Sequence, residues 1–153
     1  MTDREVGRRD LAAMMGPLMR SLVAAELPVL AAHGVSMWGY AVLSTLDEGP
    51  VRTQTALAEA IGADKTRIIA TLDELQEAGL ISRTPDPDDR RVRLLSITDQ
   101  GRRVRRAAMK EIQAKEDRIL AMLTPADRRG FLRALETLSA LPVEDVAGPA
   151  QSD

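Results

Sequence analysis

The chain has 153 residues, of which 44% are hydrophobic and 29% are charged, and its formal net charge at pH 7 is −2. This balance is typical of a globular protein and excludes a chain that is disordered throughout. Because the sequence has no cysteine and a single histidine, His33, it excludes disulfides, thiolate chemistry and a histidine-rich metal site; we expect no metal and no cofactor.

The compartment is predicted from the N-terminal segment and from the distribution of apolar residues. Residues 1–9 are charged and are not followed by the apolar core of a signal peptide. No stretch approaches the roughly 18 consecutive uncharged apolar residues of a membrane span. We therefore expect a cytoplasmic protein with no membrane partner.

A long amphipathic helix is the first predicted element. Its apolar residues recur at spacings of three and four, and they are Leu11, Met15, Leu18, Leu22, Ala25 and Val29. His33 and Gly34 end this helix, because glycine suits a left-handed C-terminal turn. Ser36 is the predicted N-cap of a second helix over about residues 37–47, which the Glu-Gly-Pro sequence at 48–50 closes.

Two short helices joined by a tight turn are predicted next. Thr53 can cap the first, Gly62 allows the turn, and Asp64 can cap a helix over residues 65–78 that Gly79 ends. The buried face of this last helix is expected to comprise Ile68, Leu72 and Leu75. The residues expected to face elsewhere are Lys65, Thr66, Arg67, Ala70 and Thr71.

A β-hairpin with a basic tip follows. Residues 80–84 and 91–97 are predicted strands, and the connection at 85–90 contains two prolines that forbid helix. Its three aspartates lack the glycine and terminal glutamate of a calcium-binding loop, so we interpret them as turn formers. Seven arginines lie between residues 90 and 106 against one carboxylate; they are Arg90, Arg91, Arg93, Arg102, Arg103, Arg105 and Arg106.

The remainder of the chain is predicted to be helical. Residues 98 to about 123 form a long helix with a thin apolar stripe, and Thr124 and Pro125 start another. The apolar residues of this last helix are Phe131, Leu135, Leu138 and Leu141. Residues 142–153 show no period, and we expect a disordered tail there.

This order of elements predicts a mainly α fold with a small β-hairpin wing, that is, a winged helix-turn-helix flanked by N- and C-terminal dimerisation helices. The DNA-binding region is expected over residues 36–98. The helical dimerisation region is expected over residues 8–34 and 99–141.

The helix-turn-helix followed by a basic hairpin indicates DNA binding. A major groove admits one helix, whose first residues meet base edges, and an arginine-tipped hairpin can reach the adjacent minor groove. Taken singly, the hairpin could be a solvated turn and residues 64–66 a plain helix cap. The candidate DNA-binding residues are Thr53, Lys65, Thr66, Arg67, Ala70, Thr71, Asp89, Arg90, Arg91 and Arg93.

These residues also carry a family resemblance. Residues 55–62, 64–67 and 72–83 resemble the MarR (multiple antibiotic resistance regulator) family, as does above all Asp86-Pro-Asp-Asp-Arg-Arg91, which Ile97-Thr98 and Gly101 follow. The resemblance covers about residues 8–141. The wing and its flanking helices are its most specific part.

The resemblance implies roles for single residues. Asp89 and Arg91 match the family's Asp-x-Arg unit, in which the carboxylate braces the wing and the arginine enters the minor groove. The start of the family's recognition helix matches Lys65, Thr66 and Arg67. One departure is Ala70, where family members often carry a basic residue; Ile69 or Ala70 could contact a thymine methyl group instead.

A homodimer on a pseudo-palindromic operator is expected, because the terminal helices carry apolar stripes longer than the central region can cover. The alternative is a three-helix bundle within one chain. The resemblance also implies an effector pocket for aromatic acids or phenols, and the absence of cysteine excludes the family's peroxide-sensing branch. The candidate ligand-binding residues, which could equally be ordinary core, are Met14, Met15, His33, Met37, Trp38 and Tyr40.

The predicted function is therefore that of a sequence-specific, DNA-binding transcriptional regulator, a repressor rather than an activator. The chain offers neither a paired nucleophile and base nor a glycine-rich phosphate loop, so we do not expect an enzyme. The alternative is a winged-helix module that binds protein without operator specificity.

Overall fold

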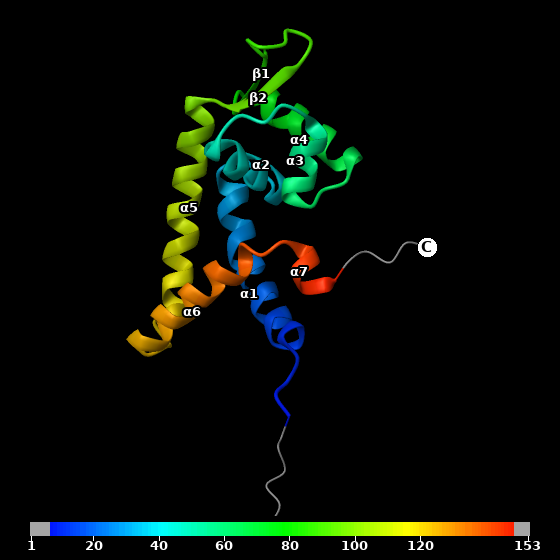
Figure 1. Cartoon of the computed structure of the whole chain (residues 1–153). Coiled ribbons are helices and arrows are strands. Elements are labelled where there is room, and N and C mark those ends of the chain that lie inside the picture. Colours follow the sequence, from blue (N-terminus) through cyan, green and yellow to red (C-terminus); the bar gives the residue numbers. More distant parts are fainter. Residues whose placement is uncertain (1–6, 149–153) are drawn as a thin grey trace, which may run out of the picture. The chain divides into compact units, whose positions relative to one another are not determined.

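In the computed structural model, which describes residues 7–148, the chain folds into helices and one β-hairpin (Figure 1). The elements in chain order are α1 (Leu11–Ala32), α2 (Met37–Glu48), α3 (Gln54–Ile61), α4 (Lys65–Glu77), β1 (Ile81–Pro85), β2 (Arg93–Ile97), α5 (Asp99–Leu120), α6 (Pro125–Ser139) and α7 (Val143–Ala147). The predicted fold class is confirmed. The chain divides into two compact units, residues 1–113 and 114–153, and α5 runs through the boundary.

The helix starts lie where the sequence places them. Ser36, Thr53, Asp64 and Thr124 each accept a hydrogen bond from the backbone N–H three residues on, at 2.9, 3.0, 2.8 and 3.2 Å respectively. Each bond satisfies one of the amide groups that the first turn of a helix leaves unpaired. The turn between α3 and α4 depends on Gly62, whose φ of +70° is a left-handed conformation that favours glycine.

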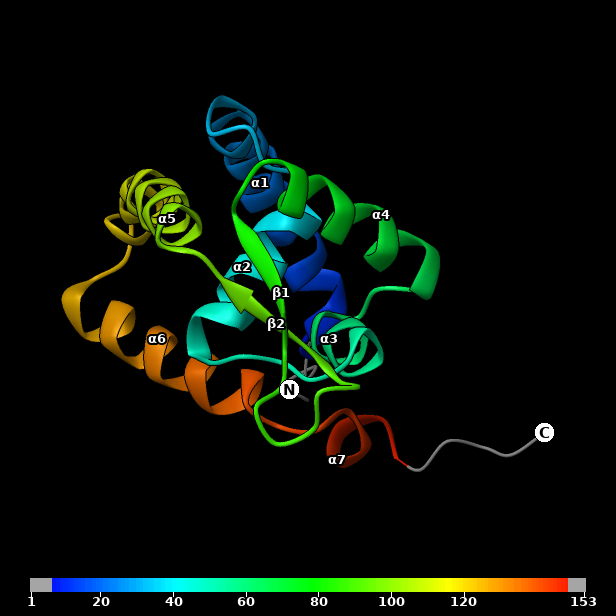
Figure 2. The same ribbon diagram turned by 90° about the horizontal axis from the view of Figure 1, so that it is seen from above.

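The core of the first unit lies among the end of α1, α2, α3, α4, the hairpin and α5. Seen from above, β1 and β2 cross the unit with α5 on one side and α3 and α4 on the other (Figure 2). The side chains that are almost completely buried are Leu30, Val42, Leu43, Leu46, Leu57, Ile68, Leu72 and Leu95. This core fixes α4 and the hairpin as neighbours in one compact body.

The hairpin is antiparallel, with register from Ile81↔Ile97 to Pro85↔Arg93. Val51 extends the sheet: its N–H donates to the Leu95 carbonyl at 3.0 Å, and the Leu95 N–H donates back at 2.8 Å. The second strand begins at Arg93, two residues later than the sequence predicts, because residues 86–92 form turns of their own.

The start of α5 is tied to the end of α4. The Thr98 N–H donates to the Leu80 carbonyl at 3.1 Å, and the Thr98 hydroxyl donates to the Gly79 carbonyl at 2.7 Å. The same hydroxyl accepts from the Gly101 N–H at 3.0 Å. Gly101 is buried at this junction, and a Cβ there would overlap the Leu80 carbonyl oxygen and come within 2.8 Å of Ile97 Cγ1.

In α1, the only buried residues are Val29 and Leu30, near its C-terminal end. The large apolar side chains that α1 exposes are Leu11, Met14, Met15, Met19 and Leu27. By length and composition alone, α1 could cross a membrane. This is weak evidence of membrane insertion, because the helix lies near the N-terminus and carries the charged residues Arg20 and Glu26.

The second unit contains the end of α5, α6 and α7. None of the residues of α6 is buried, and those with exposed large apolar side chains are Phe131, Leu132, Leu135 and Leu138. Near the end of α5, partial burial raises the pKa of Glu116, and the charge of Asp117 raises it further. Arg128 of α6 contacts Asp117 at 2.9 Å.

The expectation of a disordered tail from residue 142 differs from the structure. Residues 143–147 form the short helix α7, which follows Pro142 and has Glu144 and Asp145 in its first turn. Acidic side chains there are favourable because the N-terminus of a helix carries a partial positive charge. Five residues are too few to produce an apolar period, so the pattern could not show this helix. The last part of the predicted tail, 149–153, lies outside the described residues.

Candidate nucleic-acid interface

The first turns of α4 present polar and small side chains to solvent. Lys65, Thr66, Arg67 and Ala70 are exposed, as the sequence predicts. The Asp64 carboxylate caps the helix by accepting the Arg67 N–H at 2.8 Å, so the backbone of this turn is fixed. The exposed face of α4 therefore begins with two cations and a hydroxyl on a rigid support.

The prediction that Thr71 faces outward is wrong. Thr71 is 6% exposed, with the buried residues Ile68, Leu72 and Leu75 around it on the helix surface. Residues three and four apart lie on one face of a helix, and Thr71 stands three after Ile68 and four before Leu75. The polar residue type of Thr71 predicts exposure, but its position places it on the core-facing stripe.

The tip of the hairpin is braced by Asp89. This carboxylate accepts the Arg91 backbone N–H and the Arg91 Nε, both at 3.1 Å, and the Arg91 Nη2 at 3.4 Å. Hydrogen bonds from the Arg91 side chain and backbone lower the pKa of Asp89, with a further contribution from the charge of Arg52. The Arg91 side chain is nevertheless 91% exposed, so it is oriented and remains available.

The start of the hairpin loop is held by an ion pair that the sequence did not reveal. Arg52 lies 2.9 Å from Asp86, whose side chain is almost fully buried, and Asp86 also accepts the Asp88 N–H at 2.9 Å. Val51, the neighbour of Arg52, is paired with β2 in the sheet. A single charged residue in a loop gives no pattern, so only the sheet pairing identifies Arg52 as a partner of the wing.

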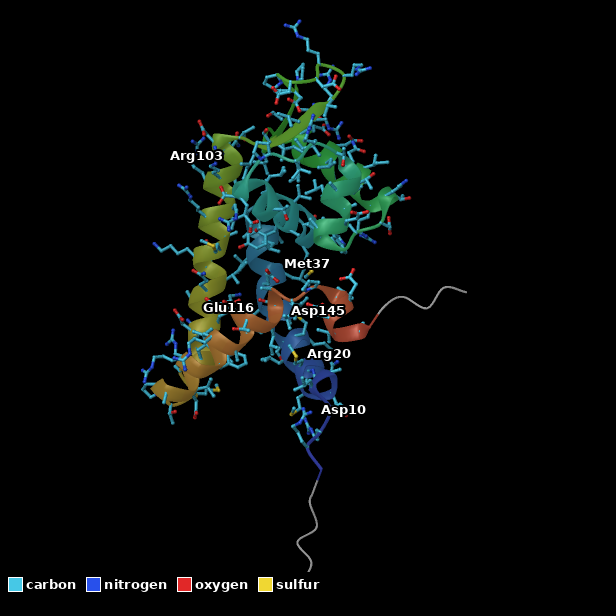
Figure 3. The ribbon with its side chains drawn as sticks, viewed as in Figure 1. Asp10, Arg20, Met37, Arg103, Glu116 and Asp145 are labelled. Atoms are coloured by element: carbon cyan, nitrogen blue, oxygen red, sulfur yellow. The ribbon has the colours of Figure 1, made fainter. Side chains whose placement is uncertain are left out.

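Part of the basic run serves the fold. Arg105 donates to Asp47 at 2.9 Å and to Ser44 at 3.3 Å, and Arg102 lies 3.4 Å from Asp47. These contacts attach α5 to α2. Arg90, Arg91 and Arg93 on the hairpin are exposed, and Figure 3 shows long side chains of the hairpin extending away from the body of the first unit, with Arg103 near the hairpin end of α5.

Two shallow hollows flank the start of α4. The larger, about 380 Å³, is lined by Ser36, Trp38, Asp64, Thr66, Arg67, Ala70, Thr71 and Glu74. The smaller, about 230 Å³, is lined by Gln54, Thr55, Lys65, Ile68 and Ile69. In the larger hollow the Arg67 guanidinium carbon lies 5.6 Å from the centre of the Trp38 ring. The first turns of α4 thus form a ridge between two depressions.

The six candidate ligand-binding residues lie in different surroundings. Met14 and Met15 are exposed on α1, and Met37 and Tyr40 pack against the core. The other two have partners from other elements: His33 Nε2 lies 2.9 Å from Glu111 Oε1, and Trp38 lies under Arg67. The role of these residues in ligand binding stays a prediction.

Comparison with known proteins agrees with this geometry. A family model described as the MarR family matches residues 35–92, which extend from the α2 cap to the hairpin. A solved structure of the transcriptional repressor CouR bound to a 23-mer DNA duplex is 30% identical, covers 85% of this chain and 92% of that one, and has a TM-score of 0.71. The chain belongs to the MarR family.

Further relatives extend the likeness beyond the central region. CouR from Rhodococcus jostii RHA1 bound to p-coumaroyl-CoA is 26% identical over 94% of this chain and 96% of that one, with a TM-score of 0.70. A protein of Thauera aromatica, named as a transcriptional regulatory protein for the hcr operon, is 29% identical over 106 residues, 69% of this chain. The chain spans 64% of the length of that curated relative.

Proposed function

We propose that this MarR-family protein is a sequence-specific regulator of transcription that binds double-stranded DNA through α4 and the wing. The observation that carries the proposal is the pairing, in one compact unit, of a capped helix start with exposed Lys65 and Arg67 and a braced hairpin tip with exposed Arg91. We infer that it is not an enzyme and that it acts in the cytoplasm.

The division of labour follows from the geometry of DNA. The first turns of α4 enter the major groove, where Lys65, Thr66 and Arg67 donate to base edges or phosphates. The wing follows the backbone to the neighbouring minor groove, where the negative potential attracts Arg91. The polar side chains at the start of α3, among them Thr53, lie next to the phosphate backbone, while Arg90 and Arg93 add positive charge to the wing.

The exposed apolar faces of α1 and α6 support a homodimer. Soluble monomers rarely expose extended apolar patches, and pairing of two chains through these helices covers them. The helical regions 8–34 and 99–141 then serve dimerisation, and residues 36–98 serve DNA binding. A two-fold dimer reads a pseudo-palindromic operator with half-sites on the order of 10 bp apart.

Repression with release by a small molecule is the mode of regulation that we propose. A dimer bound across a promoter excludes polymerase without needing an activation surface, and CouR is itself named a repressor. CouR also occurs bound to p-coumaroyl-CoA, an aromatic acyl thioester. This supports an aromatic or phenolic effector here, for which the residues Met14, Met15, His33, Met37, Trp38 and Tyr40 are the candidates.

Selection of bound sequences from random duplex DNA tests the proposal. The expected result is a pseudo-palindromic consensus whose affinity falls steeply with salt, because each arginine–phosphate contact releases counterions. Enrichment of no sequence, together with no salt-dependent affinity for the selected pool, would reject DNA binding. That negative result would favour the alternative, a winged-helix module that binds protein, because such a module needs no DNA for its activity.

A further inference from the structure

Trp38 and Arg67 come from different helices and meet on the recognition surface. The guanidinium carbon of Arg67 lies 5.6 Å from the centre of the Trp38 ring, within the roughly 6 Å over which a cation is attracted to an aromatic face. Trp38 is partly buried, whereas Arg67 is exposed. The ring is therefore the fixed member of the pair, and the arginine is the one that it orders.

The position of the ring is set by how closely α2 approaches α4. Ser36 caps α2 by accepting the Gly39 N–H at 2.9 Å. Gly39 is buried against α4, and a Cβ there would lie 3.3 Å from Leu75 Cδ2. The residue one position before this close approach is Trp38, so the cap and the glycine together hold its ring beside the first turns of α4.

Arg67 has no competing partner in the described part of the chain, where no carboxylate forms a salt bridge with it. A free arginine side chain samples many rotamers, and ordering it on binding DNA costs free energy. An arginine that already lies over an aromatic ring loses less freedom. We propose that Trp38 is a positioning residue that pre-orders Arg67 for DNA, an inference that rests on the proposed function.

Fluorescence tests the contact without any DNA. Trp38 is the only tryptophan in the sequence, so fluorescence excited at the long-wavelength edge of indole absorption, where tyrosine does not absorb, comes from this ring alone. Arg67→Ala is expected to uncover the ring, shift its emission and increase quenching by acrylamide, a neutral quencher that the arginine charge does not attract. Lys65→Ala, on the other side of the ridge, is the matched control and should change neither. Emission that is the same in Arg67→Ala as in the wild type overturns the proposal.

A double-mutant cycle tests the consequence for DNA. Trp38→Leu is expected to weaken binding to the selected duplex roughly two- to fivefold, the effect of one exposed cation–π contact. Trp38→Phe, which keeps an aromatic face, should recover most of the loss. In the Arg67→Ala background, Trp38→Leu should have no further effect, because the residue it positions is gone.

The remaining outcomes separate positioning from packing. An equal loss from Trp38→Leu in both backgrounds means that the ring acts through the fold, and tighter binding by Trp38→Leu means that it restrains Arg67; either result overturns the proposal. If Trp38→Leu does not fold, as judged by its melting transition, Trp38→Met, which also removes the aromatic face, completes the cycle with Arg67→Ala. Failure of the wild-type protein to bind any duplex rejects the proposed function, while the fluorescence arm still reports on the contact.

Discussion

Arg91 combines nearly full solvent exposure with a fixed orientation, which is what a groove-inserting side chain requires. We expect Arg91→Ala to weaken operator binding by about 1–3 kcal/mol and to lower the salt slope by about one. The melting temperature should not change, because the side chain packs against nothing but the exposed tip. Gel shifts over a salt series measure the effect, with Arg118→Ala, an exposed arginine at the far end of α5, as control. Equal losses in both variants would contradict a specific role for the wing.

The Asp89–Arg91 brace should be insensitive to pH in the neutral range. Arg91 lowers the pKa of Asp89 below its ordinary value of 3.8, so the brace is present above that value and is lost as the pH falls through the lowered pKa. NMR resonances of the wing are expected to stay constant from about pH 8 to 5 and to move only below the ordinary carboxyl range. Movement of the wing near neutral pH in the wild type, but not in Asp89→Asn, would contradict this expectation.

Ile69 is the one exposed large apolar residue of α4, at 48% exposure, and it lines the smaller hollow beside Lys65. Placed in a major groove, it can pack on the methyl group of thymine. Replacing the thymine that Ile69 contacts by uracil removes only its methyl group. Because burying a methyl-sized group is worth about 0.8 kcal/mol, this replacement should weaken binding roughly fourfold.

The thymine effect should depend on Ile69 alone. In Ile69→Ala the same uracil substitution should have little effect, whereas in Thr66→Ala it should remain. Binding constants for the two duplexes and the three proteins measure this. A uracil effect that persists in Ile69→Ala would assign the methyl contact to another side chain.

At the scale of elements, the junction of α4, β1 and α5 leaves no room at Gly101. Gly101→Ala should destabilise the fold by at least about 1–3 kcal/mol, because the new methyl overlaps backbone as well as Ile97. Gly130→Ala is the matched control: it lies within α6, its Cβ would meet nothing within 4 Å, and it should stabilise by up to about 1 kcal/mol. Denaturant midpoints of the two variants provide the comparison, and similar midpoints would contradict the close approach.

Element boundaries were predictable wherever a local chemical signal exists. The caps Ser36, Thr53 and Asp64 and the glycine after α3 all act within four residues, so sequence alone identifies them. Partners brought together by tertiary structure were not predictable. Arg52 meets Asp86 only through the Val51 sheet pairing, which no spacing along the chain encodes.

The candidate site shows the same division. Exposure of Lys65 and Arg67 and the Asp89 brace followed from local pattern and from family resemblance. The polar residue type of Thr71 predicts exposure, but its place on the helical stripe decides its burial. The Trp38–Arg67 contact joins two helices, and no spacing along the chain encodes which residues of α2 and α4 meet.

At the scale of the whole molecule, DNA binding is expected to depend on the apolar face of α6. Leu135→Glu introduces a charge among Phe131, Leu132 and Leu138 and should convert the dimer to monomers, with loss of operator binding at concentrations where the wild type binds. Thr137→Glu places the same charge about 200° away around the helix and is the control. Light scattering after size exclusion measures the mass. A monomeric wild type, or a dimer that survives Leu135→Glu, would contradict the assignment.

The hydrogen bonds from Thr98 to Gly79 and Leu80 bear on how this regulator could be re-engineered. They join the turn after α4, the hairpin and the first turn of α5 into a single rigid unit. A chimera that transplants α4 alone would separate the helix from the turn at Gly79 and Leu80 that Thr98 binds. Residues 51–101 contain both ends of these bonds and of the Val51 and Arg52 contacts that hold the wing, so we expect this segment to be the smallest cassette that can carry an operator preference into another scaffold.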